Sequence, residues 1–130
     1  MTEIIRSLAD LNGRYDAVFC DLWGCLHNGK SAYPAAVSAL QDFRKAGGKV
    51  VLLTNAPRPQ ASVVKQLQGL KVPKDAWDIV VTSGDAAQMG MLSGAVGQMG
   101  HHIGAPKDEV CFTGFADDLR EYALTRPVLH

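Results

Sequence analysis

Three runs of apolar residues, each ending on polar side chains, constrain the fold of this chain more than any other feature. They are DAVFCD (16–21), KVVLLTN (49–55) and WDIVVTSGD (77–85). An uninterrupted apolar run is typical of a strand that is buried on both faces, as the strands of a parallel sheet are. We therefore expect three parallel strands with both faces of each strand covered.

Amphipathic segments with helical spacing lie between and after these runs. The first begins at Pro34, which suits the first turn of a helix, and stops at Gly47-Gly48. The next two carry apolar residues at helical spacing, namely Val63, Val64, Leu67 and Leu70, and then Ala86, Ala87, Met89 and Met91. The alternation of strand and helix predicts an α/β fold with right-handed crossovers.

Composition limits the partners and the compartment. The 13 basic residues balance the 13 acidic ones, so charge gives no reason to expect a nucleic acid or an anionic membrane as partner. Three cysteines without a CxxC pair indicate reduced thiols, and Cys20, Cys25 and His27 lack the second ligand pair of a zinc site. With neither a signal peptide nor an apolar run of about 20 residues, we expect a soluble, cytoplasmic protein.

Polar residues at the three strand ends are the candidates for chemistry. Asp21, Thr54-Asn55 and Thr82-Ser83 follow the apolar runs, and the carboxyl ends of parallel strands share the edge of a sheet where ligands bind. A carboxylate there can act as a nucleophile, while hydroxyl and backbone N–H groups hold phosphoryl oxygens and Mg²⁺ offsets their charge. The alternative is that these ends are polar merely because they reach water.

A family resemblance favours the first interpretation. DLWGCLHNG (21–29) and VVLLTNAPR (50–58) resemble the first two motifs of the haloacid dehalogenase (HAD) superfamily, and with VTSGDA (81–86) they look like subfamily IIA, the nitrophenylphosphatase-like and nucleotide-phosphatase-like enzymes. The match covers residues 14 to 90. It implies a three-layer Rossmannoid parallel sheet and hydrolysis of a small phosphorylated metabolite, a phosphate monoester, through an aspartyl-phosphate.

The resemblance also assigns roles to single residues. The nucleophile of the family falls on Asp21, and its phosphate-oxygen donor falls on Thr54, followed by Asn55; Gly24 is expected to bind phosphate as well. The Mg²⁺ ion would be held by the Asp21 carboxylate and the backbone carbonyl of Trp23. Residues 23–29 would form a small turn and flap over the site.

The chain departs from the family at the position of the general acid. Phosphatases of this family carry a second aspartate two residues after the nucleophile, which protonates the leaving group. Here that position is Trp23, and an indole does not transfer a proton at neutral pH. His27 is the nearest titratable side chain, although an ordinary loop histidine is the simpler interpretation.

The second departure concerns the later motifs. The lysine and the aspartate motif that follow the cap domain are not found, and Asp117-Asp118 is interpreted as a pair at a helix start. We expect residues 1–95 to be the N-terminal part of a HAD-like core and residues 96–130 the entry to a truncated cap. The alternative function is a degenerate, non-catalytic domain that binds an anion or serves in assembly. An incomplete core also predicts a homodimer through an exposed sheet edge.

Overall fold

The computed structural model describes residues 3–97, 99–101, 103–112 and 123–125. The chain divides into two compact units, which are described separately. One comprises Met1–Thr54 and Ala61–Val81, and the other comprises Asn55–Gln60 and Thr82–His130.

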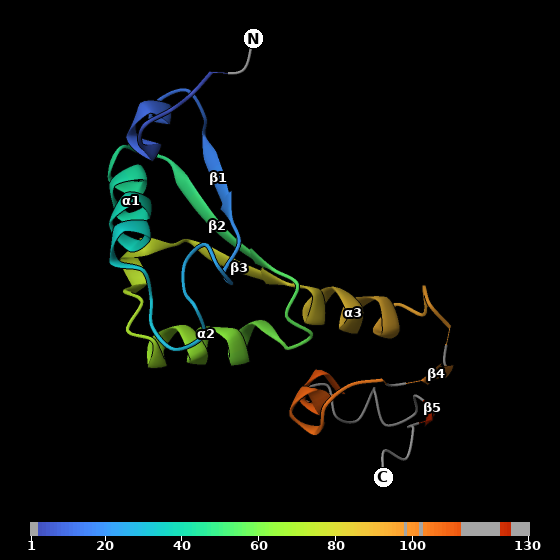
Figure 1. The fold of residues 1–130 in the computed structure, drawn as a ribbon. Helices are drawn as coiled ribbons and strands as arrows, with labels where there is room; N and C mark the ends of the chain where they lie inside the picture. The colour runs from blue at the N-terminus through green and yellow to red at the C-terminus, as the bar shows by residue number, and fades with distance from the viewer. Residues whose placement is uncertain (1–2, 98, 102, 113–122, 126–130) are drawn as a thin grey trace. The chain divides into compact units, whose positions relative to one another are not determined.

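The first unit is built on a parallel sheet of three strands in the order β1-β2-β3 (Figure 1). The strands are β1 (Ala17–Cys20), β2 (Lys49–Thr54) and β3 (Ile79–Thr82), and the helices between them are α1 (Pro34–Lys45) and α2 (Gln60–Gly69). Two short 3-10 helices complete the unit, η1 (Leu8–Leu11) and η2 (Lys74–Ala76). The predicted α/β class and its parallel strands are confirmed.

Helix α1 begins and ends where its sequence predicts. Pro34 occupies its first turn, and Val37, Leu40 and Phe43 are its buried residues. After the helix, Gly47 takes a φ of +95°, which an L side chain rarely adopts. A Cβ atom at Gly48 would overlap the ring of Phe43. Gly47 therefore allows the turn after the helix, and Gly48 allows the backbone to pass close to the Phe43 ring.

The sheet is covered on one face only within the described part of the first unit. Val50, Leu52 and Val80 are buried, whereas Phe19 is 69% exposed and Leu53 48% exposed. Both crossovers advance in the same direction across the sheet, so right-handed connections place α1 and α2 on the same face. The prediction that each strand is buried on both faces is therefore wrong for these residues.

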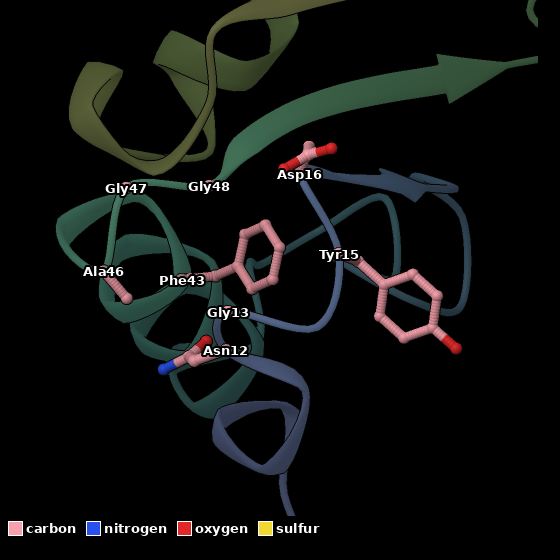
Figure 2. Close-up of a pocket in the computed structure, with 8 residues that line it drawn as sticks. All are labelled: Asn12, Gly13, Tyr15, Asp16, Phe43, Ala46, Gly47 and Gly48. Atoms are coloured by element: carbon pink, nitrogen blue, oxygen red, sulfur yellow. The ribbon is translucent and has the colours of Figure 1, made fainter.

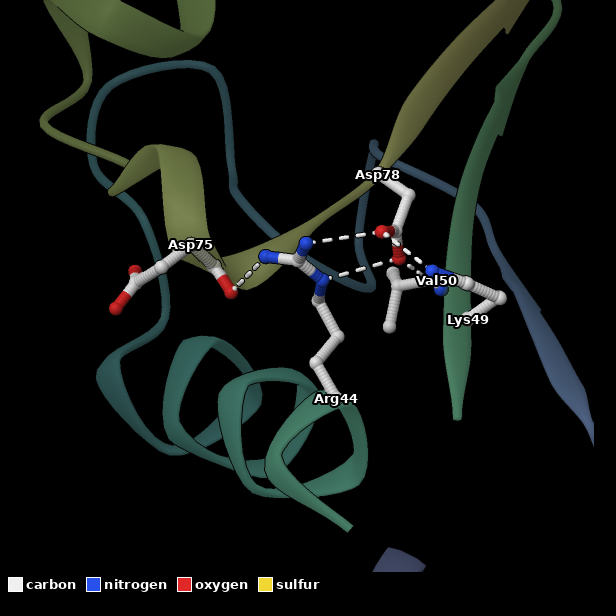
Figure 3. Close-up of polar contacts among 5 residues, drawn as sticks. All are labelled: Arg44, Lys49, Val50, Asp75 and Asp78. Carbon is white, nitrogen blue, oxygen red and sulfur yellow. Dashed lines mark hydrogen bonds and ion pairs between the residues drawn. The ribbon is translucent and has the colours of Figure 1, made fainter. Parts of the chain in front are cut away.

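An ion pair anchors α1 to the amino ends of β2 and β3 (Figure 3). The guanidinium of Arg44 donates to both carboxylate oxygens of Asp78, at 3.0 and 2.9 Å, and also to the carbonyl of Asp75. Asp78 accepts the backbone N–H of Val50 at 2.8 Å. These bonds favour the ionised carboxylate and lower the pKa of Asp78 to about 2.

The second unit contains α3 (Ser83–Leu92), η3 (Pro106–Phe112) and a pair of parallel strands, β4 (Met99–His101) and β5 (Ala123–Thr125). The amide of Gln88 in α3 donates to the carbonyl of Cys111 at 2.6 Å, and both residues are buried. The expected division into a core (1–95) and a cap entry (96–130) stays a prediction. The Asp117-Asp118 pair lies outside the described residues.

Candidate active site

Asp21 follows β1 directly and is exposed. Its Oδ1 atom accepts the backbone N–H of Leu22 at 2.7 Å, and Leu22 itself is buried. The buried neighbour fixes the backbone while the carboxylate stays in contact with solvent. This combination leaves the side chain accessible to a ligand at the carboxyl edge of the sheet.

The segment after Asp21 forms a tight turn rather than an open loop. The carbonyl of Leu22 accepts the N–H groups of Leu26 and His27 at 2.9 and 3.0 Å, and Gly24 donates its N–H to the carbonyl of His27 at 2.9 Å. Gly24 has a φ of +76°, which explains the glycine. Its phosphate-binding role stays a prediction, and its N–H would have to leave His27 to reach a phosphate oxygen.

A second turn closes the flap that the sequence predicts for residues 23–29. The Oδ1 atom of Asn28 accepts the N–H groups of Lys30 and Ser31 at 2.9 and 2.8 Å, and Asn28 donates its own N–H to the carbonyl of Ser31. Tyr33 then donates to the carbonyl of Leu26. The flap is therefore held by its own hydrogen bonds.

His27 lies inside the flap. It is 1% exposed, and its Nδ1 atom accepts the N–H of Gly29 at 3.0 Å. Burial lowers its pKa, although the negative charge of Asp21 opposes this shift. The imidazole is thus neutral at pH 7 with its proton on Nε2, and Nε2 has no hydrogen-bond partner in the described part of the chain.

Trp23 lies on the outside of the same flap. It is 67% exposed, and its ring centroid lies 6.2 Å from that of His27 in an edge-on arrangement. The indole takes the place of the missing general acid. The backbone carbonyl of Trp23 and the Asp21 carboxylate are oxygen donors of the kind that Mg²⁺ prefers, and Mg²⁺ sites often use one or two protein ligands with waters and substrate phosphate.

Thr54 and Asn55 occupy the end of β2. The register pairs Cys20, the last residue of β1, with Leu52 of β2. Asp21 comes one residue after Cys20 and Thr54 two residues after Leu52, so both lie at the carboxyl edge of the sheet. Thr54 is 9% exposed. Asn55 follows it and is exposed. The chain thus places a carboxylate and a hydroxyl at this edge, as the strand pattern predicts.

Thr82 has a different function from the one that its position suggests. Its hydroxyl donates to Oδ2 of Asp85 and accepts the N–H of Asp85, both at 2.9 Å. Gly84 donates its N–H to the carbonyl of Ala56, and a Cβ atom at Gly84 would collide with the backbone of Arg58. The VTSGDA motif therefore holds the start of α3 against the 55–60 segment. The spacing of Thr82 and Asp85 was a helix-cap signal that strand-end reasoning overlooked.

Two cavities lie at the opposite, amino edge of the sheet. One, of about 110 Å³, is bordered by Asn12, Asp16 and Phe43 (Figure 2). The other, of about 320 Å³, is lined by the Arg44 and Asp78 pair together with Lys49. Neither cavity includes Asp21, Trp23 or Thr54.

The cysteine of β1, Cys20, is a partly buried free thiol. Burial raises the pKa of Cys20 to about 11, with smaller contributions from the charges of Cys25 and Asp21. Without a bound metal ion, this shift favours the protonated thiol at neutral pH. Among the described residues, no helix is long and apolar enough to cross a membrane.

The fold and the edge residues together define a class, the α/β proteins with a parallel sheet and an acidic residue directly after the first strand. Residues 18–122 match the family of haloacid dehalogenase-like hydrolases, so the chain belongs to that family. The resemblance to the N-terminal part of subfamily IIA is thereby supported. No curated protein matches the chain.

Solved structures agree with this assignment. A haloacid dehalogenase-like hydrolase from Brucella suis 1330 is 41% identical, with a TM-score of 0.77, and the match covers 86% of this chain and 42% of that one. A 4-nitrophenylphosphatase from Thermotoga maritima is similar in fold at 24% identity and a TM-score of 0.57, over 75% and 37% of the two chains. A hypothetical protein from Pyrococcus horikoshii OT3 is 18% identical with a TM-score of 0.55, over 86% and 41%. The chain thus spans less than half the length of these proteins.

Proposed function

We propose that this chain carries the nucleophile half of a phosphate monoester hydrolase, with Asp21 as the nucleophile. The observation that carries the proposal is the exposed Asp21 carboxylate at the carboxyl end of β1, followed by a self-supporting flap, within the segment that matches the family. A carboxylate in this position is accessible to a phosphoryl group from solvent.

The proposed reaction has two steps. An oxygen of the Asp21 carboxylate forms a bond to phosphorus while the bond from phosphorus to the ester oxygen breaks, and the leaving group departs with that electron pair as an alkoxide or phenolate, which takes a proton from solvent. A water oxygen then forms a bond to phosphorus, the bond to Asp21 breaks, and a proton passes to solvent. Thr54 and backbone N–H groups would hold the phosphoryl oxygens during both steps.

A bound Mg²⁺ ion would neutralise charge between the carboxylate and the phosphate dianion. In this chain the Asp21 carboxylate and the Trp23 carbonyl are the residues proposed to hold it. Because the hydrogen bond from Leu22 goes to Oδ1 of Asp21, that bond orients the carboxylate for either role.

Neither Trp23 nor His27 is suited to protonate the leaving group. Trp23 has no acidic proton to give, and His27 is buried and neutral with a lowered pKa. The leaving group must therefore depart without a proton from either side chain. We expect slow turnover by this chain, and faster turnover for esters of more acidic alcohols.

The test compares Mg²⁺-dependent hydrolysis of 4-nitrophenyl phosphate by the chain and by Asp21→Asn, with Asp42→Asn as a matched control on the exposed surface of α1. The proposal expects turnover that Asp21→Asn abolishes and Asp42→Asn preserves. Equal background rates for all three proteins would overturn it.

A role in assembly is the second candidate, and the structure gives a specific reason for it. Strand β1 pairs with β2 alone in the described part of the sheet, and its residues (Ala17–Cys20) include neither a charge nor a proline to protect the free edge. We propose a second copy of this chain as the partner. Two β1 edges related by a two-fold axis would pair antiparallel and extend the sheet.

A further inference from the structure

The open face of the main sheet carries an apolar patch to which all three strands contribute. Alternate residues of a strand point to opposite faces, so the open face holds the residues that alternate with buried Val50, Leu52 and Val80. Four exposed apolar side chains make up this open-face patch, namely Phe19 (69%), Leu53 (48%), Ile79 (46%) and Val81 (39%). Phe19 belongs to it because its register partner is Val51, two residues before Leu53. Neighbouring exposed apolar side chains of this kind mark an interaction surface.

The open-face patch has the dimensions of one short α-helix. Three strands span two inter-strand spacings, about 10 Å in all, and an α-helix with its side chains is about 10 to 12 Å across. The three strands hold four to six residues each, so at about 3.3 Å per residue they are about 13 to 20 Å long. A helix of about 9 to 13 residues has that length. Helices α1 and α2, on the covered face, have 12 and 10 residues.

Charges at the two ends of the strands favour one direction for such a helix. Lys49, which alternates with the same open-face residues, begins β2 at the amino edge, and its side chain is 72% exposed although Asp78 lies 3.7 Å away. Asp21 is exposed directly after β1, at the carboxyl edge. A helix carries partial positive charge at its N-terminus and partial negative charge at its C-terminus. A helix antiparallel to the strands therefore complements both side chains, and a parallel one opposes both.

We propose that the open-face patch binds an amphipathic helix of a second polypeptide, equivalent to the part of the related hydrolases that lies outside their match to this chain. The matches cover 42%, 37% and 41% of the three solved chains, so more than half of each lies outside. Purely parallel sheets occur almost only with helices on both faces, which favours a helix over the sheet of a second copy as the cover. The proposed contact involves the face of the sheet and not the β1 edge, and it is independent of the chemistry at Asp21.

Co-expression tests the proposed contact. The probe is the part of the Brucella suis hydrolase outside the match, made as a separate polypeptide together with this chain. A 1:1 complex is expected, and in NMR spectra of the chain the methyl signals of Leu53, Ile79 and Val81 should shift. The methyl signals of Val50 and Val80, on the covered face, are the internal control. Absence of a complex, or a complex whose shifts are confined to other residues, would overturn the proposal.

Substitutions on two strands test the same surface. Leu53→Lys and Val81→Lys should each weaken the complex by at least about 10-fold, because apolar contact is lost and a charge is buried. Ile4→Lys is the matched control, since Ile4 is 92% exposed and precedes the sheet. Unchanged affinity in both open-face variants, with the covered-face methyl signals intact, would overturn the proposal. Concentration-dependent shifts of Leu53 and Val81 in the chain alone would assign the face to a second copy and overturn it as well.

Discussion

The carboxylate of Asp85 accepts the backbone N–H of Gln60 through both oxygens, at 3.0 and 3.1 Å. Gln60 is the first residue of α2, and Asp85 lies in the first turn of α3. A helix start has N–H groups without partners inside the helix, and an acidic side chain there is favoured by hydrogen bonding and by the helix dipole. Asp85, a residue of the VTSGDA motif in α3, thus caps the start of α2.

Removing this cap should lower stability. Asp85→Ala would leave the Gln60 N–H without its acceptor and would remove the carboxylate to which the Thr82 hydroxyl donates, although that hydroxyl still accepts the backbone N–H of residue 85; the expected cost is about 1 to 2 kcal/mol. Urea denaturation measures the change. Asp85→Asn keeps an acceptor oxygen and should recover part of the loss; a full loss in Asp85→Asn as well would show that charge, and not the hydrogen bond, carries the effect.

The Arg44–Asp78 pair predicts a dependence of stability on acid. The folded pKa of Asp78, about 2, lies below the ordinary aspartate value of 3.8, so the unfolded chain binds the proton more tightly than the folded one. The stabilisation is fully present above about pH 4 and is lost as the pH falls through about 2. Asp78→Asn should cost about 2 kcal/mol at pH 7 and flatten the denaturation profile between pH 4 and 2. An unchanged profile would show that Asp78 is not responsible.

His27 predicts a second dependence of stability on pH, which arises from burial of its imidazole and not from an ion pair. Burial lowers its folded pKa from the ordinary histidine value of 6.5, so protonation favours the unfolded chain. Stability should therefore decline as the pH falls below about 6.5 and continue to decline towards the lowered folded pKa. Urea titrations at pH 7.5 and 5.5 measure this difference. His27→Leu should reduce this difference, and an unchanged difference in that variant would contradict the prediction.

The uncovered sheet predicts self-association. Phe19 is 69% exposed on edge strand β1, so Phe19→Lys places a charge on the proposed contact without leaving a cavity in the monomer. Light scattering over a range of concentrations should give a dimer for the wild-type chain and a monomer for Phe19→Lys, while Phe19→Leu remains dimeric. A wild-type monomer at all concentrations would contradict the assembly.

Local patterns explain how much of the fold could be predicted. Pro34 and the glycine pair at residues 47 and 48 mark the ends of α1, and the apolar runs locate all three strands of the main sheet. The predicted burial of both faces failed because periodicity reports only that a residue is apolar. Phe19 and Val50 are both apolar, yet the topology places one on the open face and the other under the helices.

The residues of the candidate site also divide into those that local sequence features predict and those whose role depends on distant contacts. The sequence indicated Asp21 and Thr54, because a strand end is a local feature and the motif spacing is specific. It missed the role of Thr82 and Asp85, since the partner of Asp85 is Gln60, 25 residues earlier in the chain. Likewise it did not indicate that Trp23 is exposed and supported by Gly29, which depends on a turn with left-handed geometry.

The sequence by itself determined the three strands of the main sheet, the helices α1, α2 and α3 and their order, the family and the identity of the residue after the first strand. Those properties depend on neighbours a few residues away, where spacing and side-chain type decide the outcome. The tertiary structure alone decided which sheet face is covered, that Asp85 caps α2 and that the indole of Trp23 faces solvent. Each of these depends on where distant segments meet, and a contact between distant segments leaves no periodic pattern in the chain.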